Sequence, residues 1–211
     1  MNYKTHAKAW GIGLTGGIAT GKSLSAQIIQ KQGYFVLDAD NFSRKILLPG
    51  EPAYIEVLNA FGNDILNDDK SINRGKLREI IFSNASKKQI LEQITHPQIA
   101  KSLKLELEKN RILEQKKHWF YEAALLFEVG RNKEFNQIWV TYCPQTLQID
   151  RLKSRDNINT SQAMAIIDSQ WPAEKKKALA DVVIETDVTK AELEANISQL
   201  LGSLAAAKTS T

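Results

Sequence analysis

The stretch GGIATGKS at residues 16–23 constrains this chain more than any other part of the sequence. It fits the phosphate-loop pattern G-x-x-x-x-G-K-[S/T], which is short enough to arise by chance, so its surroundings must support it. The apolar residues 10–14 predict a buried strand before the loop, and Leu24, Ile28 and Ile29 recur at helical spacing after it. Strand, glycine-rich loop and helix together form the context in which backbone N–H groups and a helix N-terminus surround a phosphate.

Two side chains of this phosphate loop have specific expected roles. Lys22 would bridge the terminal phosphate oxygens of a nucleotide, and the Ser23 hydroxyl would be a ligand of Mg²⁺. The alternative is an ordinary glycine-rich turn with a surface lysine, which the neighbouring strand and helix disfavour. The residues expected to cradle the nucleotide are Gly17, Ile18, Ala19, Thr20, Gly21, Lys22, Ser23 and Leu24.

Length and composition are those of a globular protein. The 211 residues suit one α/β domain with inserted segments, or one domain with a smaller one. No apolar run approaches the length of a membrane span, and the polar residues 1–8 are not typical of a signal peptide, so we expect a cytoplasmic protein with no membrane partner. The single cysteine, Cys143, excludes an internal disulfide and agrees with a reducing compartment. We expect a monomer, or at most a weak oligomer.

The charge of the chain suits polyanionic ligands. Its net charge is +4, which nucleotides and nucleic acids would both satisfy. The lysine run at residues 175–177 is more typical of a solvated helix face than of a binding patch. We therefore expect no nucleic-acid partner.

A second apolar run, residues 34–37, ends in Asp38-Ala39-Asp40. It predicts a buried strand with two carboxylates at its C-terminal end, where ligands bind in open α/β sheets. Asp38 and Asp40 should then lie near the phosphate loop, facing the same way if the strand persists. The alternative is a helix cap or turn, and Asp40 could serve both purposes because a helical stretch with Arg44 follows.

Residues 50–115 carry helical patterns only. Pro52 and Asn73 are suited to start two of the helices. Residues 86–89 form a capping box for another helix, which the Thr-His-Pro of residues 95–97 would end before a longer helix begins. This stretch is too long for a simple crossover between strands, so we predict an inserted helical subdomain that binds substrate.

Three further strands complete the pattern, at residues 119–126, 137–142 and 181–185. Five strands alternating with helices predict an α/β protein of the P-loop kinase fold, with a parallel sheet flanked by helices. Glu128 follows the first of these three strands and, like Asp38, is a candidate for the acid that supports a bound Mg²⁺ ion from beyond its direct ligands. A salt bridge from Glu128 to a lysine is a competing interpretation. The predicted core comprises residues 9–49, 116–147 and 179–204.

Residues 148–178, between the fourth and fifth strands, are predicted to form a lid. Arg151 and Arg155 are four residues apart, so both would lie on the same face of one helix, and a polar turn follows at residues 156–160. Because the segment follows a strand, its start lies on the ligand side of the sheet. The alternative is a pair of solvated arginines that pair with neighbouring aspartates.

With these residues placed, the chain resembles the dephospho-CoA kinase family from about residue 12 to residue 200. A phosphate loop alone is shared by very many proteins, whereas an ordered set of motifs is specific. The matching motifs are Leu14-Thr15-Gly16-Gly17, Asp38-Ala39-Asp40 with Arg44, Ile72-Asn73-Arg74, His96-Pro97, Leu125-Leu126-Phe127-Glu128, Arg151 and Arg155 with Gln170, and the ADVVI of residues 180–184.

This resemblance implies a kinase that uses ATP and Mg²⁺ to phosphorylate the 3′-hydroxyl of the dephospho-CoA ribose. It implies Asp40 as the catalytic base, with Lys22, Arg151 and Arg155 also catalytic. The substrate-binding residues that it implies are Thr15, Asp38, Arg44, Arg74, His96 and Leu125. For His96 a capping role, and for Arg74 an exposed helix charge, are the alternatives.

Four positions depart from the family pattern: Ala19, Ala124, Ile166 and Thr186 stand where glycine, proline, arginine and asparagine are usual. Alanine at position 19 is tolerable provided that its φ angle is not positive. The changes at Ile166 and Thr186 affect the expected lid and adenine contacts.

Two other functions fit parts of the sequence. A nucleoside or nucleoside-monophosphate kinase would share the loop and lid, but would have no reason for the His96-Pro97 pair. A non-catalytic nucleotide-binding switch would bind ATP without turnover, and the retained Lys22, Ser23 and Asp40 argue against it.

Overall fold

The computed structural model describes residues 3–206 and divides into two compact units. The sheet unit comprises Met1–Asp38 and Ile112–Thr211, and the helical unit comprises Ala39–Arg111. Each unit has a hydrophobic cluster of its own. The helical unit begins earlier than the predicted subdomain of residues 50–115, and its role in substrate binding stays a prediction.

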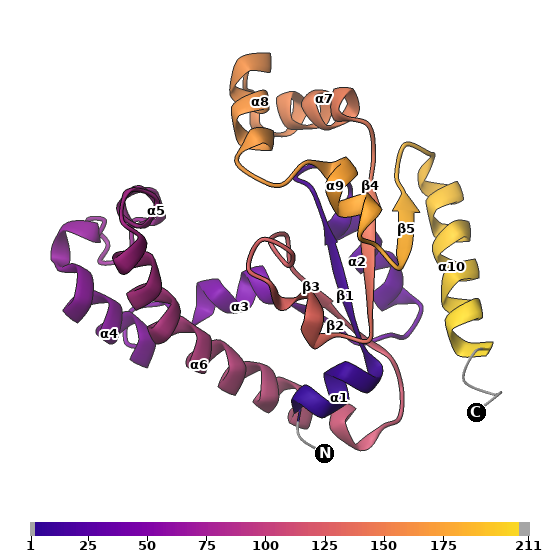
Figure 1. Ribbon diagram of the computed structural model, residues 1–211, viewed down its shortest axis with the longest axis horizontal. Helices are drawn as coiled ribbons and strands as arrows, with labels where there is room; N and C mark the ends of the chain where they lie inside the picture. Colours follow the sequence, from indigo (N-terminus) through magenta and orange to yellow (C-terminus); the bar gives the residue numbers. More distant parts are fainter. Residues whose placement is uncertain (1–2, 207–211) are drawn as a thin grey trace. The chain divides into compact units, whose positions relative to one another are not determined.

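The sheet unit is built on five parallel strands in the order β2-β3-β1-β4-β5 (Figure 1). The strands are β1 (Gly11–Gly16), β2 (Val36–Asp38), β3 (Trp119–Glu122), β4 (Gln137–Tyr142) and β5 (Val182–Glu185). The predicted α/β fold with a five-stranded parallel sheet is thus confirmed. Because all strands run the same way, the segments that follow β1, β2, β3 and β4 all leave from the same edge of the sheet.

Two helices cover one face of this sheet: α2 (Lys22–Lys31) and α10 (Lys190–Ala206), which runs beside β5 in Figure 1. Side chains alternate along a strand, so Ile12 and Leu14 of β1 point to the same face and join the cluster that these helices close. The predicted capping box of the last helix is confirmed, since Thr189 and Glu192 bond each other's backbone N–H groups.

The remaining elements of the sheet unit include α1 (Tyr3–Trp10) and α9 (Ala173–Ala178), which contact β1. The short helices η2 (Ile112–Glu114) and η3 (Arg131–Glu134) precede β3 and β4, and α7 (Gln145–Asp156) and α8 (Thr160–Asp168) lie beyond the carboxyl end of β4 (Figure 1). The predicted strand start at residue 10 is wrong, because Trp10 ends α1. Buried His6 holds α1 in place by accepting a hydrogen bond from the Trp119 indole.

Two strand ends differ from the prediction. The strand predicted at residues 119–126 stops at Glu122, and the chain then turns. The strand predicted at residues 34–37 spans Val36–Asp38, and α3 (Ala39–Lys45) begins directly after it. Asp40 therefore lies in the first turn of a helix, and the expectation that it shares a strand face with Asp38 is wrong.

The helical unit consists of α3, α4 (Pro52–Phe61), η1 (Asn63–Ile65), α5 (Arg74–Ser83) and α6 (Ala85–Lys109). Pro52 occupies the start of α4, and the Asn73 side chain caps α5, as predicted. Its core gathers Tyr54 and Val57 of α4 with Leu77 of α5, and the first half of α6 packs against this cluster. The unit is therefore held together by contacts among its own helices.

The predicted break at residues 95–97 is wrong, because α6 runs through Pro97 without interruption. A proline removes only one backbone donor, while Leu91 and Ile94 pack on the core of the helical unit and hold the helix in register. The predicted capping box at residues 86–89 is also wrong. The N-cap of α6 is Asn84, whose side chain accepts from the Lys87 N–H.

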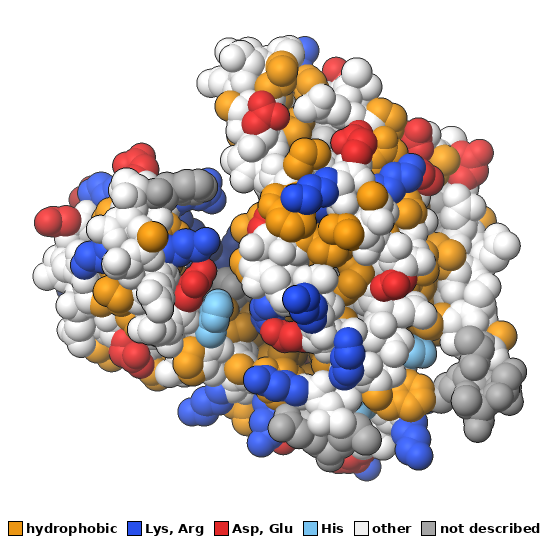
Figure 2. Space-filling model, viewed as in Figure 1, with side chains coloured by type: hydrophobic (Ala, Val, Ile, Leu, Met, Phe, Trp, Pro, Cys, Tyr) orange, Lys and Arg blue, Asp and Glu red, His pale blue; other side chains and the backbone are white. Residues whose placement is uncertain are grey.

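Basic, acidic and hydrophobic side chains are interspersed over the face of the molecule in Figure 2. Within residues 3–206, no helix is both long enough and apolar enough to cross a membrane.

Candidate active site

The phosphate loop connects β1 to α2 through a sharply bent backbone. Gly21, the N-cap of α2, has a φ of 83°, and Ala19 has a φ of 60°. The condition under which alanine is tolerable at position 19 is therefore not met. A left-handed conformation costs an alanine about 1–2 kcal/mol relative to its ordinary backbone, a cost that glycine avoids.

Contacts on both sides fix the loop. The Thr20 hydroxyl bonds the Gly17 carbonyl oxygen at 2.7 Å and the Thr141 hydroxyl of β4 at 2.8 Å. Arg151 of α7 donates to the Ala19 carbonyl oxygen at 3.2 Å. The loop is thus hydrogen-bonded to the neighbouring strand β4 and to α7, a helix of the predicted lid.

Lys22 and Ser23 meet an acid that the sequence analysis did not single out. Lys22 Nζ lies 2.7 Å from Glu122 Oε1, and the Ser23 hydroxyl donates to the same oxygen at 3.2 Å. The Lys22 and Glu122 side chains are only 12% and 8% exposed, so water screens this ion pair weakly. Asp38, at the end of β2, lies opposite Glu122 in the pairing of β2 with β3. The sequence signal for Glu122 was an acid at the end of an apolar strand. It was missed because the strand was predicted to continue to residue 126.

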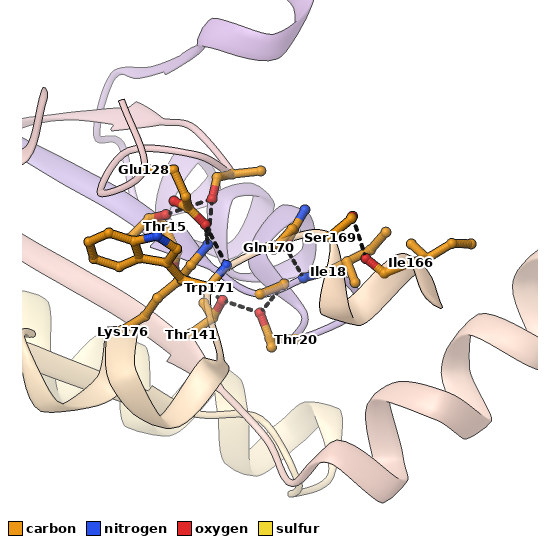
Figure 3. A network of polar contacts seen from close by, with 12 residues as sticks. Thr15, Ile18, Thr20, Glu128, Thr141, Ile166, Ser169, Gln170, Trp171 and Lys176 are labelled. Atoms are coloured by element: carbon orange, nitrogen blue, oxygen red, sulfur yellow. Dashed lines mark hydrogen bonds and ion pairs between the residues drawn. The ribbon is translucent and has the colours of Figure 1, made fainter. Parts of the chain in front are cut away.

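Glu128 instead forms the salt bridge that was its alternative role. Its Oε1 lies 2.7 Å from Lys176 Nζ, and Lys176 also donates to the Ala124 carbonyl oxygen at 2.9 Å (Figure 3). Lys176 is completely buried, so the interpretation of residues 175–177 as a solvated face is wrong for its central lysine. Burial lowers the pKa of Lys176, and the Glu128 carboxylate opposes that shift.

The two lid arginines have different partners. Arg151 donates to the Thr186 hydroxyl at 3.1 Å and to the Ala19 carbonyl oxygen, so it joins the turn after β5 to the phosphate loop. Arg155 forms two bonds with Asp156, at 2.8 and 2.7 Å, and its side chain is 58% exposed. Pairing raises the pKa of Arg155 and lowers that of Asp156. In this structure the two guanidinium groups therefore bond different partners.

Several predicted substrate residues lie in the helical unit. The Arg74 guanidinium bonds the Ser43 carbonyl oxygen at 3.4 Å, and burial together with the charges of Arg44 and Arg78 lowers the pKa of Arg74. Such crowding of like charges favours an anionic ligand. Asp40 and His96 are exposed, on α3 and α6 respectively.

The other three predicted substrate residues, Thr15, Asp38 and Leu125, lie in the sheet unit. Leu125 is 43% exposed in the turn after β3, whereas Thr15 is buried in β1. The Thr15 hydroxyl donates to the Ala124 carbonyl oxygen at 3.3 Å, beside Lys176 (Figure 3). Thr15 thus supports the turn that presents Leu125.

Comparison with known proteins decides the family. A family model described as dephospho-CoA kinase matches residues 10–192. The chain belongs to the dephospho-CoA kinase family. It is 41% identical to the dephospho-CoA kinase of Carboxydothermus hydrogenoformans over 175 residues, which cover 82% of this chain and 84% of that protein. It is 40% identical to the dephospho-CoA kinase of Coxiella burnetii, with 90% and 94% covered.

Solved structures agree with this membership of the dephospho-CoA kinase family. The dephospho-CoA kinase of Campylobacter jejuni superposes with a TM-score of 0.65 at 30% identity, covering 94% of this chain and 98% of that one. A crystal structure from Thermus thermophilus gives a TM-score of 0.80 at 27% identity, covering 92% and 97%. None of these matches favours a nucleoside kinase, and membership of a kinase family implies that the chain uses ATP.

The buried lysine gives the first prediction. Lys176→Met should lower the free energy of unfolding by about 3–5 kcal/mol, because it leaves the Glu128 carboxylate without its buried counter-ion. Lys177→Met is the matched control, since Lys177 pairs with Glu185 at the surface, where both side chains are well exposed. Urea denaturation measures both variants. Equal effects of the two substitutions would contradict a structural role for the buried pair.

Proposed function

We propose that this chain transfers the γ-phosphate of ATP to the 3′-hydroxyl of the dephospho-CoA ribose, giving ADP and coenzyme A. The observation that carries the proposal is the meeting of Lys22, Ser23 and Glu122 at the phosphate loop of a chain that belongs to this family. Phosphoryl transfer depends on positioning and on neutralising charge more than on covalent chemistry with the protein. The candidate residues supply both.

The phosphate loop binds the nucleotide. Backbone N–H groups of residues 17–24, except that of Ile18, which donates to Gln170, surround the phosphates, and the N-terminus of α2 adds its partial positive charge. Lys22 exchanges its bond to Glu122 for the terminal phosphate oxygens of ATP. Arg151 keeps the loop joined to the turn after β5, where Thr186 replaces the usual asparagine.

Support for a Mg²⁺ site comes from the chemistry of two side chains. The Ser23 hydroxyl and the Glu122 carboxylate lie 3.2 Å apart, and both offer the oxygen atoms that this hard cation prefers. Ser23 would bind the ion, and Glu122, rather than Glu128, would be the acid that supports it. When bound, Mg²⁺ neutralises charge on the phosphate oxygens.

The helical unit binds the acceptor substrate. Arg44 and Arg74 form a basic cluster that suits the diphosphate of dephospho-CoA. Asp40, separated from the end of β2 by Ala39 alone, accepts or orients the proton of the 3′-hydroxyl. Of the other residues that the resemblance implies for the acceptor, His96 belongs to this unit, whereas Asp38 and Leu125 belong to the sheet unit.

We place the reaction in the cytoplasm, carried out by a monomer. The sole cysteine, Cys143, is free and buried, as suits a reducing compartment.

The second prediction tests the reaction itself. ADP production from ATP should rise on addition of dephospho-CoA, and should stay at its background rate with adenosine or with a panel of nucleoside monophosphates. A coupled assay for ADP, together with chromatographic detection of coenzyme A, measures the outcome. Stimulation by a nucleoside instead would assign the chain to the nucleoside kinases.

The third prediction concerns the base. Asp40→Asn should reduce turnover by a factor of about 10² or more while ATP still binds, because the amide cannot accept the hydroxyl proton. Asp68→Asn, which changes an exposed acid of the same unit, is the control and should leave turnover unchanged. Near-normal turnover of the Asp40 variant would remove Asp40 from the mechanism.

The fourth prediction concerns the lid. We assign Arg155 a transition-state contact, made when it leaves Asp156 for the transferring phosphoryl group. Arg155→Ala should therefore lower kcat much more than it raises the KM for dephospho-CoA. Amide hydrogen exchange over residues 148–178 should slow when both substrate sites are occupied by a bisubstrate analogue. Unchanged exchange and unimpaired turnover would leave this segment as ordinary surface.

A further inference from the structure

A short connector, residues 169–172, joins α8 to α9 and touches the phosphate loop. Gln170 Oε1 accepts a hydrogen bond from the Ile18 N–H of the loop at 2.9 Å (Figure 3). The next residue, Trp171, donates its own N–H to Glu128 Oε1 at 3.1 Å. The connector thus joins the loop that follows β1 to the turn that follows β3.

The buried ion pair of Glu128 with Lys176 fixes the position of the connector. Glu128 Oε1 lies between the Trp171 N–H and Lys176 Nζ, and Lys176 is completely buried. The rings of Phe127 and Trp171 are stacked, with an interplanar angle of 9° and centroids 6.3 Å apart. Gln170 therefore projects from a rigid segment, so its amide has a defined position.

The lid helices hold the same part of the loop from its other side. Ile18 and Ala19 pack against a hydrophobic cluster of Leu152, Ala163 and Ile167, which belong to α7 and α8. Arg151 also donates to the Ala19 carbonyl oxygen. The tip of the phosphate loop, residues 18–19, is thus fixed at the Ile18 N–H and at the Ala19 carbonyl.

These two fixed groups lie on either side of the φ torsion of Ala19, which is 60°. An alanine released from outside contacts prefers a negative φ, because in the left-handed region its Cβ crowds the following carbonyl oxygen. A glycine at this position would have no such preference. In this chain, then, the loop tip depends on outside contacts to keep its shape. A loop with glycine at position 19 would depend on them less.

We propose that Gln170 is a positioning residue that, supported by the Glu128–Lys176 pair, holds the tip of the phosphate loop in its left-handed, nucleotide-binding shape. Gln170 does not touch the reacting atoms and acts through the Ile18 N–H. The inference rests on the proposed function for its turnover readout only, because nucleotide binding and backbone exchange test it separately.

The distinguishing feature of this role is coupling between positions 170 and 19. If Gln170 opposes the relaxation of Ala19, its removal should matter less once residue 19 is glycine, which is stable at positive φ. A Gln170 that only supports packing of the connector would lose the same affinity in either background. A double-mutant cycle separates the two cases.

The experiment compares Gln170→Met, Ala19→Gly and the double variant in the full chain. Gln170→Met keeps the size of the side chain and removes the acceptor; it should weaken ADP binding about five- to tenfold, the range set by one lost hydrogen bond. In the Ala19→Gly background the same substitution should weaken ADP binding less than about twofold. Gln199→Met, at an exposed position of α10, controls for the change of residue type.

Three readouts decide the outcome. Calorimetric titration gives the Kd for ADP, hydrogen exchange reports the Ile18 amide, and steady-state kinetics separate the KM for ATP from kcat. The Ile18 amide should exchange faster in both variants that carry Gln170→Met, and at its normal rate in Gln199→Met. Equal losses of ADP affinity in both backgrounds, or no loss in either, would overturn the proposal. If Gln170→Met does not fold, Gln170→Asn, which stays polar but is too short to reach Ile18, takes its place in the cycle.

The design also separates this inference from the proposed function. A wild-type chain that binds ADP but shows no turnover with dephospho-CoA would refute the function and leave the coupling measurable. Normal turnover with additive losses at positions 19 and 170 would refute the positioning role alone.

Discussion

The central position of β1 in a parallel sheet is the constraint on which the site depends. Because β1 lies between β3 and β4, the loop that leaves it is flanked by the segments that leave both neighbours. One neighbour supplies Glu122 to Lys22 and Ser23, and the other supplies Thr141 to Thr20. A different strand order would separate these groups even if every element of the sheet unit were retained. The chemistry of the phosphate loop therefore follows from the order of the strands as much as from the motif.

The ion pair of Lys22 with Glu122 sets the electrostatics of the nucleotide site that we propose. Both side chains are almost buried, so a phosphate that takes Lys22 away leaves a carboxylate in weakly screened surroundings. In the function that we propose, Ser23 would bind a divalent cation, with Glu122 as the neighbouring acid, and that cation would restore the balance of charge. Without nucleotide, Lys22 stabilises the Glu122 carboxylate. With nucleotide, Lys22 would also interact with the phosphate, so it would stabilise Glu122 less. In the function that we propose, the same few atoms thus stabilise the empty loop and make the loaded loop dependent on a cation.

Local signals predicted most of the fold. The strand, loop and helix around residues 16–23, the start of α4 at Pro52 and the capping of the last helix at Thr189 were all visible in short stretches of sequence. What escaped prediction depends on contacts between distant residues. Glu122 and Lys176 could not be placed because the length of β3 and the burial of α9 are decided by tertiary packing. The continuity of α6 through Pro97 likewise depends on the helices against which it packs, and no pattern within residues 95–97 reveals it.

Ala19 also bears on how such a sequence can change over evolutionary time. An alanine in a left-handed conformation is acceptable only where neighbouring groups already restrain the backbone, here through Gln170 and Arg151. The reverse change, from alanine to glycine, requires no such restraints, because glycine adopts a positive φ readily. The order of substitutions at this position therefore matters. The restraints must be in place before alanine can be tolerated at position 19. Once the alanine is present, a substitution that removes a restraint also affects the loop.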